Sequence, residues 1–282
     1  MPGKVTIGTV RFLNAWPLTF GLEGRDDVGL RAEAPSALAP LLRTGEVDVA
    51  LLPSIEYFRM AAEGPERARG GVGGGYVALP VAAIGSRGPI GSVRLFGYAE
   101  PAKLRRVQLD PASRTSNALA EILVVRRLKA WPHFTVPLEG APPPARPPDA
   151  ELIVGDRALS AERPGARWVL DLGQEWEGYV HRPFIYAFWV ARAGAPLEWL
   201  IEVLSAARDR GLAARDELAV RGAKAVGIPV EAARRYLTEQ VEYEFGPKQH
   251  QGLRAFYRMA SEDGLAPDGV RLHLARAGGP SE

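Results

Sequence analysis

Short apolar segments alternate with amphipathic segments over the first two-thirds of the chain. Apolar runs of strand length span residues 5–10, 47–52 and 150–154. Each run ends near a polar residue, where the next segment has the features of a helix start. Alternation of this kind is typical of parallel strands joined by crossover helices. The pattern therefore predicts an α/β protein with parallel strands flanked by helices.

Local signals refine this outline. Ser36 is a natural N-cap for a helix over 37–43, and Gly45 then ends that helix. The glycine-rich segment 70–75 and the proline-rich segment 141–148 are expected to be loops. Further strands are expected over 30–34, 76–84, 92–96, 106–110, 134–137 and 184–191, and further helices over 55–62, 113–129, 197–212, 215–226, 230–239 and 248–262.

A similarity between two segments of the chain suggests how these elements are organised. Residues 48–54 resemble residues 149–156, because each is a buried-type strand that ends in a polar residue at a helix start. Two similar halves followed by returning helices predict two lobes. We expect lobe I to be discontinuous, with residues 1–91 plus 190–282, and lobe II to be inserted as residues 92–189. The apolar strand Phe184–Ala191 is expected to cross between them, with a ligand cleft at the strand ends.

Composition removes several classes of function. The 35 Lys and Arg residues nearly balance the 33 Asp and Glu residues, giving a net charge of +2 without a basic block. No nucleic-acid or membrane partner is therefore expected. The chain has no cysteine and only four separated histidines, so we expect neither disulfides nor a metal site. The first residues lack the features of an export signal, which favours a cytoplasmic protein.

The clearest candidate for chemistry joins a predicted strand to a predicted helix. Residues 110–117 read Asp-Pro-Ala-Ser-Arg-Thr-Ser-Asn, with three hydroxyls at the helix start. Free amides and the helix dipole at such a point attract a carboxylate or phosphate. Simple capping by one hydroxyl is the alternative. The candidate binding residues here are Ser113, Arg114, Thr115, Ser116 and Asn117.

Three other polar residues follow predicted strands. Asn14, Ser54 and Asp156 each stand at a helix start, where capping is the ordinary role. Their joint occurrence at strand ends favours a shared site. Asp156 would repel an anionic ligand, so we expect it to accept a hydrogen bond from a hydroxyl or a backbone amide. The sequence has no GxSxG motif, no P-loop and no GxGxxG fingerprint.

Several of these segments together resemble a known family. Residues 12–18, Phe-Leu-Asn-Ala-Trp-Pro-Leu, are similar to the FLN-x-x-PL opening of the chorismate dehydratases of the futalosine pathway to menaquinone. Residues 113–116, Ser-Arg-Thr-Ser, match a second motif of that family at a suitable separation. Further matches lie at 51–57, 88–93, 153–156, 171–173, 183–184 and 245–246. The resemblance covers nearly the whole chain.

The resemblance implies a two-lobed fold like that of type II periplasmic binding proteins, with mixed sheets flanked by helices. It implies dehydration of chorismate to 3-[(1-carboxyvinyl)oxy]benzoate, with no metal or other cofactor and with the small molecule chorismate as the substrate. Asn14 and Ser92 match the family's catalytic positions. Ser54, Asp156 and the residues at 113–117 are then the candidates for substrate binding.

Two other functions remain open at this point. One is that of a 1,4-dihydroxy-6-naphthoate synthase, a later enzyme of the same pathway with a similar fold. That family opens with a cysteine-containing motif, whereas this chain reads Leu13-Asn14-Ala15 and has no cysteine. The other is a non-catalytic cytoplasmic solute-binding protein.

Overall fold

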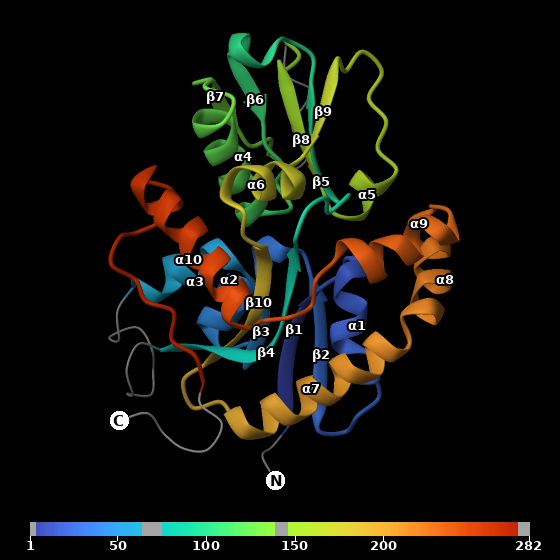
Figure 1. Cartoon of the computed structure of the whole chain (residues 1–282). Coiled ribbons are helices and arrows are strands. Elements are labelled where there is room, and N and C mark those ends of the chain that lie inside the picture. Colours follow the sequence, from blue (N-terminus) through green and yellow to red (C-terminus); the bar gives the residue numbers. More distant parts are fainter. Residues whose placement is uncertain (1–3, 64–74, 139–145, 276–282) are drawn as a thin grey trace.

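Two five-stranded sheets stand one above the other and form two lobes (Figure 1). The computed structural model describes residues 4–63, 75–138 and 146–275. Most of the expected glycine-rich loop and part of the proline-rich loop therefore lie outside the described residues. The lobe built on the first sheet contains Lys4 and Ala275, the first and last described residues, and the second lobe lies above it in this view.

The first sheet has the strand order β2-β1-β3-β10-β4. Strand β1 pairs in parallel with both β2 and β3, as the alternating pattern predicts. Strand β10 runs antiparallel to β3 on one side and to β4 on the other. The strands are β1 (Val5–Val10), β2 (Val28–Glu33), β3 (Val49–Pro53), β4 (Tyr76–Ser86) and β10 (Phe184–Arg192).

The second sheet has the order β7-β6-β8-β5-β9. Strand β6 is parallel to β7 and β8, whereas β5 is antiparallel to β8 and β9. The strands are β5 (Val93–Gly97), β6 (Arg106–Gln108), β7 (His133–Thr135), β8 (Ala150–Val154) and β9 (Trp168–Asp171). Both sheets are thus mixed, as expected.

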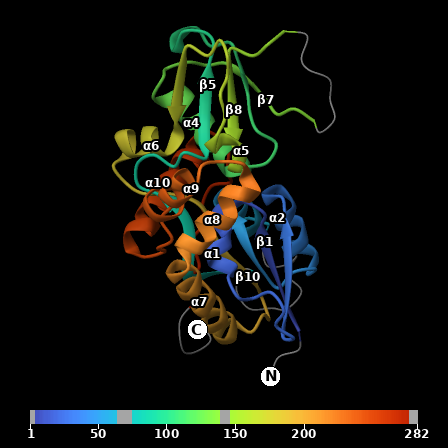
Figure 2. The ribbon, with the colours of Figure 1, turned by 90° about the vertical axis from the view of Figure 1, so that its right-hand side faces the viewer.

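The helices divide between the lobes (Figures 1 and 2). Helices α4, α5 and α6 belong to the second lobe, and the C-terminal helices return to the first. Early helices are η1 (Leu13–Ala15), α1 (Trp16–Thr19), α2 (Pro35–Thr44) and α3 (Ser54–Ala61). The second lobe has η3 (Pro101–Lys103), α4 (Arg114–Arg126), α5 (Asp156–Leu159) and α6 (Leu172–Val180). The last are α7 (Leu197–Ala213), α8 (Arg215–Val226), α9 (Val230–Arg235), the π-helix η4 (Tyr236–Gln240) and α10 (Pro247–Glu262).

The structure changes three details of the predicted outline. Strand β10 lies wholly in the first sheet and does not cross between lobes, so the expected limit at 190 falls inside it. The exact limits of the lobes stay a prediction. Ser36 is not a cap: α2 begins at Pro35 after Ala34, whose side chain makes no cap bond. The pair β9 and α6 was not expected.

A single large core unites most of the buried side chains of both lobes. Trp176, Trp189 and Phe188 are fully buried within it and do not line a cleft. Trp176 and Phe184 meet edge to face, with ring centroids 5.1 Å apart, which joins α6 to β10. In the described part of the chain, no helix is both long and apolar enough to cross a membrane.

Candidate functional site

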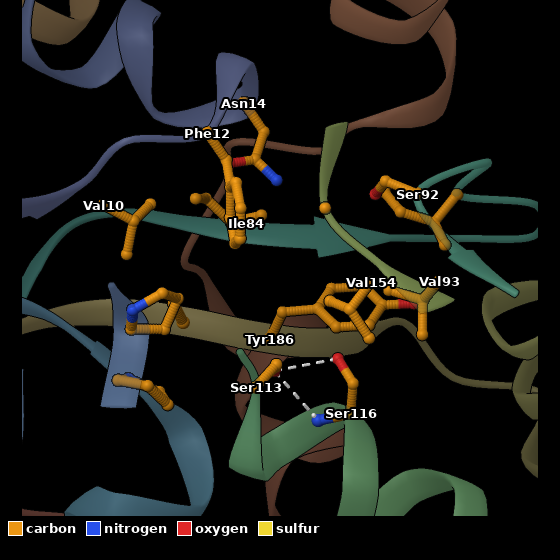
Figure 3. Close-up of a pocket in the computed structure, with 15 residues that line it drawn as sticks. Val10, Phe12, Asn14, Ile84, Ser92, Val93, Ser113, Ser116, Val154 and Tyr186 are labelled. Carbon is orange, nitrogen blue, oxygen red and sulfur yellow. Dashed lines mark hydrogen bonds between the residues drawn. The ribbon is translucent and has the colours of Figure 1, made fainter. Parts of the chain in front are cut away.

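A pocket lies between the lobes at the ends of strands β1, β3 and β8 (Figure 3). Its empty space, including the part open to solvent, is about 480 Å³, of which about 50 Å³ is accessible to the centre of a water molecule. The lining residues are Val10, Phe12, Asn14, Pro35, Pro53, Ile84, Ile90, Ser92, Val93, Ser113, Ser116, Val154, Gly155, Tyr186 and Ala187.

Asn14 and Ser92 are joined across the pocket by one phenol. The Asn14 Nδ2 donates to the Tyr236 hydroxyl at 2.9 Å, and that hydroxyl donates to Ser92 Oγ at 2.9 Å. All three residues are buried. The Asn14 Oδ1 has no hydrogen-bond partner among the described residues. Asn14 and Ser92 thus both line the pocket, and the Ser92 hydroxyl, which accepts from Tyr236, keeps its own proton to donate.

Local structure explains why these side chains meet. Strand β1 ends at Val10, and Phe12 has extended dihedral angles that turn the chain into η1, which carries Asn14. Ser92 directly precedes β5. Tyr236 opens the π-helix η4, where the wider turn continues α9. Burial raises the pKa of Tyr236 above its ordinary value, so its hydroxyl stays protonated and can donate to Ser92.

The start of α4 forms another polar wall of the pocket (Figure 3). The Ser113 Oγ accepts from the Ser116 backbone N at 3.2 Å and donates to Ser116 Oγ at 3.0 Å. Ser113 is therefore the N-cap of α4, which agrees with the alternative that one hydroxyl of this segment caps the helix. The Ser116 hydroxyl accepts this bond, which leaves its own proton free. The amides of Arg114 and Thr115 lie in the first turn, where no helical carbonyl can reach them.

The neighbouring candidates have other partners and do not line the pocket. The Thr115 hydroxyl accepts from the Ile55 amide at 3.2 Å and so links α4 to α3 of the other lobe. Asn117 exchanges two hydrogen bonds with the backbone of Asp110, at 2.9 and 3.0 Å. Arg114 forms an ion pair with the buried carboxylate of Glu56 at 3.4 Å.

Ser54 is also placed away from the pocket. It is fully buried, and its hydroxyl donates to the carbonyl of Ile185 at 2.6 Å. This bond ties the start of α3 to strand β10. The structure thus gives Ser54 a role in the first lobe's packing, and its predicted contact with substrate is not supported by this position.

Asp156 lies beside the pocket at the start of α5. Its two carboxylate oxygens accept from the backbone N of Leu13 at 3.0 and 3.1 Å. The expectation that it accepts from an amide is therefore met, although the donor belongs to the protein. Burial raises the pKa of Asp156 to about 6, against the opposing effect of the Leu13 hydrogen bond.

Sequence reasoning missed three residues at this site. Phe12 and Tyr186 line the pocket, and Tyr236 connects Asn14 with Ser92. Phe12 stands within the motif that carried the resemblance, so it could have been found there. Tyr186 lies in an unbroken apolar strand, where its hydroxyl was the one available signal. Tyr236 has no such local signal.

Charge is absent from the wall of this pocket. Its polar groups are the hydroxyls, one amide and backbone groups, and no Asp, Glu, Lys, Arg or His is among the lining residues. The described residues hold no group of three His, Asp or Glu side chains arranged to bind a metal ion. Neutral donors and a helix N-terminus can still stabilise a carboxylate, because the donors are already oriented.

The chain is similar to known proteins over most of its length. A family described as "Menaquinone biosynthesis" matches residues 5–262. The chain is 29% identical over 267 residues to the chorismate dehydratase of Thermus thermophilus, a match that covers 89% of this chain and 93% of that protein.

Solved structures with lower identity share the fold. A protein from Archaeoglobus fulgidus has a TM-score of 0.68 at 17% identity, with 93% of this chain and 98% of that chain covered. The periplasmic aliphatic sulphonate binding protein of Escherichia coli has a TM-score of 0.64 at 15% identity, with 100% and 96% covered. These likenesses confirm the predicted periplasmic-binding-protein fold.

Proposed function

Because the chain belongs to the menaquinone biosynthesis family, we propose that it is a chorismate dehydratase, a carbon–oxygen lyase. The reaction would convert chorismate to 3-[(1-carboxyvinyl)oxy]benzoate and water in the cytoplasm. The similarity to the Thermus thermophilus enzyme supports this substrate. The observation that carries the proposal is the pair Asn14 and Ser92, joined by Tyr236 at an uncharged pocket between the lobes.

The proposed reaction balances without an oxidant or a reductant. The ring carbon that bears the ether loses a proton, and its neighbour loses hydroxide. The electron pair of the C–H bond becomes the new ring double bond, and the proton and hydroxide leave as water. The product ring is aromatic, which makes the elimination strongly favourable. The protein must hold two carboxylates and stabilise charge that develops on the ring system.

The pocket suggests which groups take part. Tyr186 is the one side chain with an ordinarily ionisable group in the lining set, and burial raises its pKa well above the usual value. A strong protein base is thus not available there. We assign proton removal to the substrate's own enolpyruvyl carboxylate, held close to the ring proton. Asn14 would orient this carboxylate through Nδ2, and Ser92 would donate to the departing hydroxyl.

A cofactor-free assay tests the reaction. Purified protein is mixed with chorismate, and 3-[(1-carboxyvinyl)oxy]benzoate is sought by mass and ultraviolet absorbance. Product formation supports the proposal. Tight binding of chorismate without turnover would favour the solute-binding alternative. Failure to bind or convert chorismate, with turnover of a later pathway intermediate, would favour the naphthoate-synthase alternative.

Substitutions then test the two residues. Asn14→Ala and Ser92→Ala should each lower kcat by about 10- to 100-fold, with a smaller change in KM, because positioning acts on the transition state. Thr9→Val is a matched control, since the Thr9 hydroxyl is buried in β1 and has no partner in the part of the chain that the structure describes. It should keep the normal kcat. If both site variants keep it as well, the assignment of Asn14 and Ser92 is wrong.

A further inference from the structure

Two turns from different lobes meet beside the pocket. The turn after β1 contains Leu13, and the turn after β8 contains Asp156. Both carboxylate oxygens of Asp156 accept from the Leu13 amide, at 3.0 and 3.1 Å. The Phe12 ring also lies against Gly155, where an added Cβ would be 2.5 Å from Phe12 Cε1. The two turns are therefore fitted closely to each other.

We propose that Asp156 is a positioning residue that acts on the reaction through Asn14. By holding the Leu13 amide it fixes the next residue, Asn14, in the geometry that chemistry needs, and it holds the lobes together at this edge. The inference rests on the proposed function for the identity of the reaction. Its structural part, the closure of the lobes, stands independently.

Direct contact between Asp156 and the substrate is disfavoured by three observations. Asp156 is not among the residues that line the pocket. Both of its oxygens are directed at one amide of the protein. A carboxylate close to a substrate with two negative charges would also repel it. The Asp156 carboxylate thus supports the residues of the site and is not part of the surface that binds the substrate.

Further hydrogen bonds connect Asn14 back to the turn that contains Asp156. From Asn14 a bond runs to Tyr236, and from Tyr236 to Ser92 Oγ. The Ser92 carbonyl in turn accepts from the amide of Gly155 at 2.8 Å. Gly155 precedes Asp156, so the bonds close a loop that joins both lobes. Loss of the Asp156 carboxylate would open this loop at the bond nearest to Asn14.

Three variants of Asp156 separate the requirements for an acceptor and for its placement. Asp156→Ala removes the acceptor and should lower kcat about 10- to 100-fold, with KM changed less, because small displacements of a reacting group have effects of that size. Asp156→Asn keeps an acceptor oxygen and should retain kcat within about threefold. Asp156→Glu leaves no cavity but shifts the carboxylate, so it should also lower kcat.

Asp149→Ala provides a matched control. The Asp149 carboxylate also accepts from backbone amides, those of Arg105 and Arg106, at 2.8 and 2.9 Å. It lies at the other end of β8, away from the pocket. This variant should lose some thermal stability but keep kcat. Equal losses of kcat in Asp149→Ala and Asp156→Ala would reduce Asp156 to a general structural role and overturn the proposal.

Lobe closure can be measured without any turnover. The chain has no cysteine, so spin labels can be attached at Ala102→Cys in η3 and Ala225→Cys in α8, both exposed. Double electron–electron resonance should show longer distances in Asp156→Ala than in the parent, with Asp156→Asn unchanged. An unchanged distance together with a normal kcat in both Asp156→Ala and Asp156→Glu would refute the inference. If the parent converts no chorismate, the proposed function fails, and the distances alone decide the inference.

Discussion

The chemistry of this site depends on neutral side chains whose hydrogen bonds are already oriented. Tyr236 keeps Asn14 and Ser92 at fixed positions, since its hydroxyl accepts from one and donates to the other. A side chain held by such bonds does not need to reorganise as charge develops on a substrate. Asn14 Oδ1 has no hydrogen-bond partner among the described residues, so it could accept from a ligand hydroxyl or a second donor.

Tyr236→Phe tests this arrangement at the level of one oxygen atom. The variant leaves Asn14 Nδ2 and Ser92 Oγ without their buried partner, so we expect about 1–3 kcal/mol lower stability. We also expect a lower kcat, because both proposed catalytic groups gain freedom. Chemical denaturation and steady-state kinetics measure the two effects.

Tyr243→Phe is the matched control for that substitution. Tyr243 is buried as well, but its hydroxyl has no hydrogen-bond partner among the described residues. Its removal should leave stability unchanged or slightly raised, with normal kinetics. Equal effects of the two substitutions would show that the Tyr236 bonds do not organise the site.

The residues of the site differ in how far sequence could predict them. Asn14 and Ser92 were found because they stand in or beside recognisable segments. Tyr236 could not be found, because its contact with Asn14 joins positions 222 residues apart and depends on a π-helix. Thr115 and Asn117 were expected to bind substrate because sequence cannot show which hydroxyls and amides the protein's own backbone will occupy.

At the scale of elements, helix α4 offers the pocket a helix N-terminus that is already capped. Ser113 serves as the cap, and the bond that it donates to Ser116 leaves the Ser116 proton free. The helix is 13 residues long and its first turn faces the pocket through these two serines. A carboxylate placed there would receive a hydroxyl proton together with the free amides of the first turn.

Ser116→Ala should therefore weaken chorismate binding by tenfold or more. A charge-assisted hydrogen bond contributes about 1.5–3 kcal/mol, and about 1.4 kcal/mol corresponds to a factor of ten in affinity. Calorimetry with a slow variant such as Asn14→Ala as the background would report binding without turnover. Ser205→Ala on α7 is a control of the same chemistry outside the pocket. Unchanged affinity in Ser116→Ala would exclude the start of α4 as a carboxylate site.

The elements themselves were predictable where the hydrophobic pattern agreed with the residues that begin or end an element. Strands β1 and β8 have the predicted bounds, and Gly45 ends α2 in the left-handed conformation. The strand Trp168–Asp171 was missed because it lies at a sheet edge and is only partly buried, which weakens its apolar pattern. The following helix, Leu172–Val180, contains two glycines that obscure its helical signal.

At the scale of the whole molecule, the alternation predicted parallel strands and the resemblance implied mixed sheets, but neither gave the path of β10. An unbroken apolar strand fits either a crossing segment or a central strand buried on both faces. The structure shows the second case, since Phe188 pairs with Leu52 on one side and with Ala83 on the other. This pairing depends on contacts far apart in the chain, which periodicity does not encode.

The contact between the lobes also predicts how stability depends on pH. Burial raises the pKa of Asp156 to about 6 in the folded protein, from about 3.9 in an unfolded chain. The folded state thus binds this proton more tightly. Protonation of Asp156 therefore stabilises the folded state relative to the unfolded state. This stabilisation is fully present below about pH 3.9 and is lost as the pH rises through about 6. Above that range, the buried charge lowers stability by up to about 3 kcal/mol.

Asp156→Asn removes the charge and keeps an acceptor for Leu13, so it should stabilise the protein at pH 8. The gain should shrink by about 1.4 kcal/mol between pH 8 and pH 5, because the parent takes up the proton over that range. Urea denaturation of both proteins at the two pH values measures the difference, and other titrating groups cancel in the comparison. A gain that is equal at both values, or that grows toward pH 5, would show that folding does not raise the pKa of Asp156 and that it stays an anion over this range. The contact between the lobes would then depend on its charge and not simply on its oxygen.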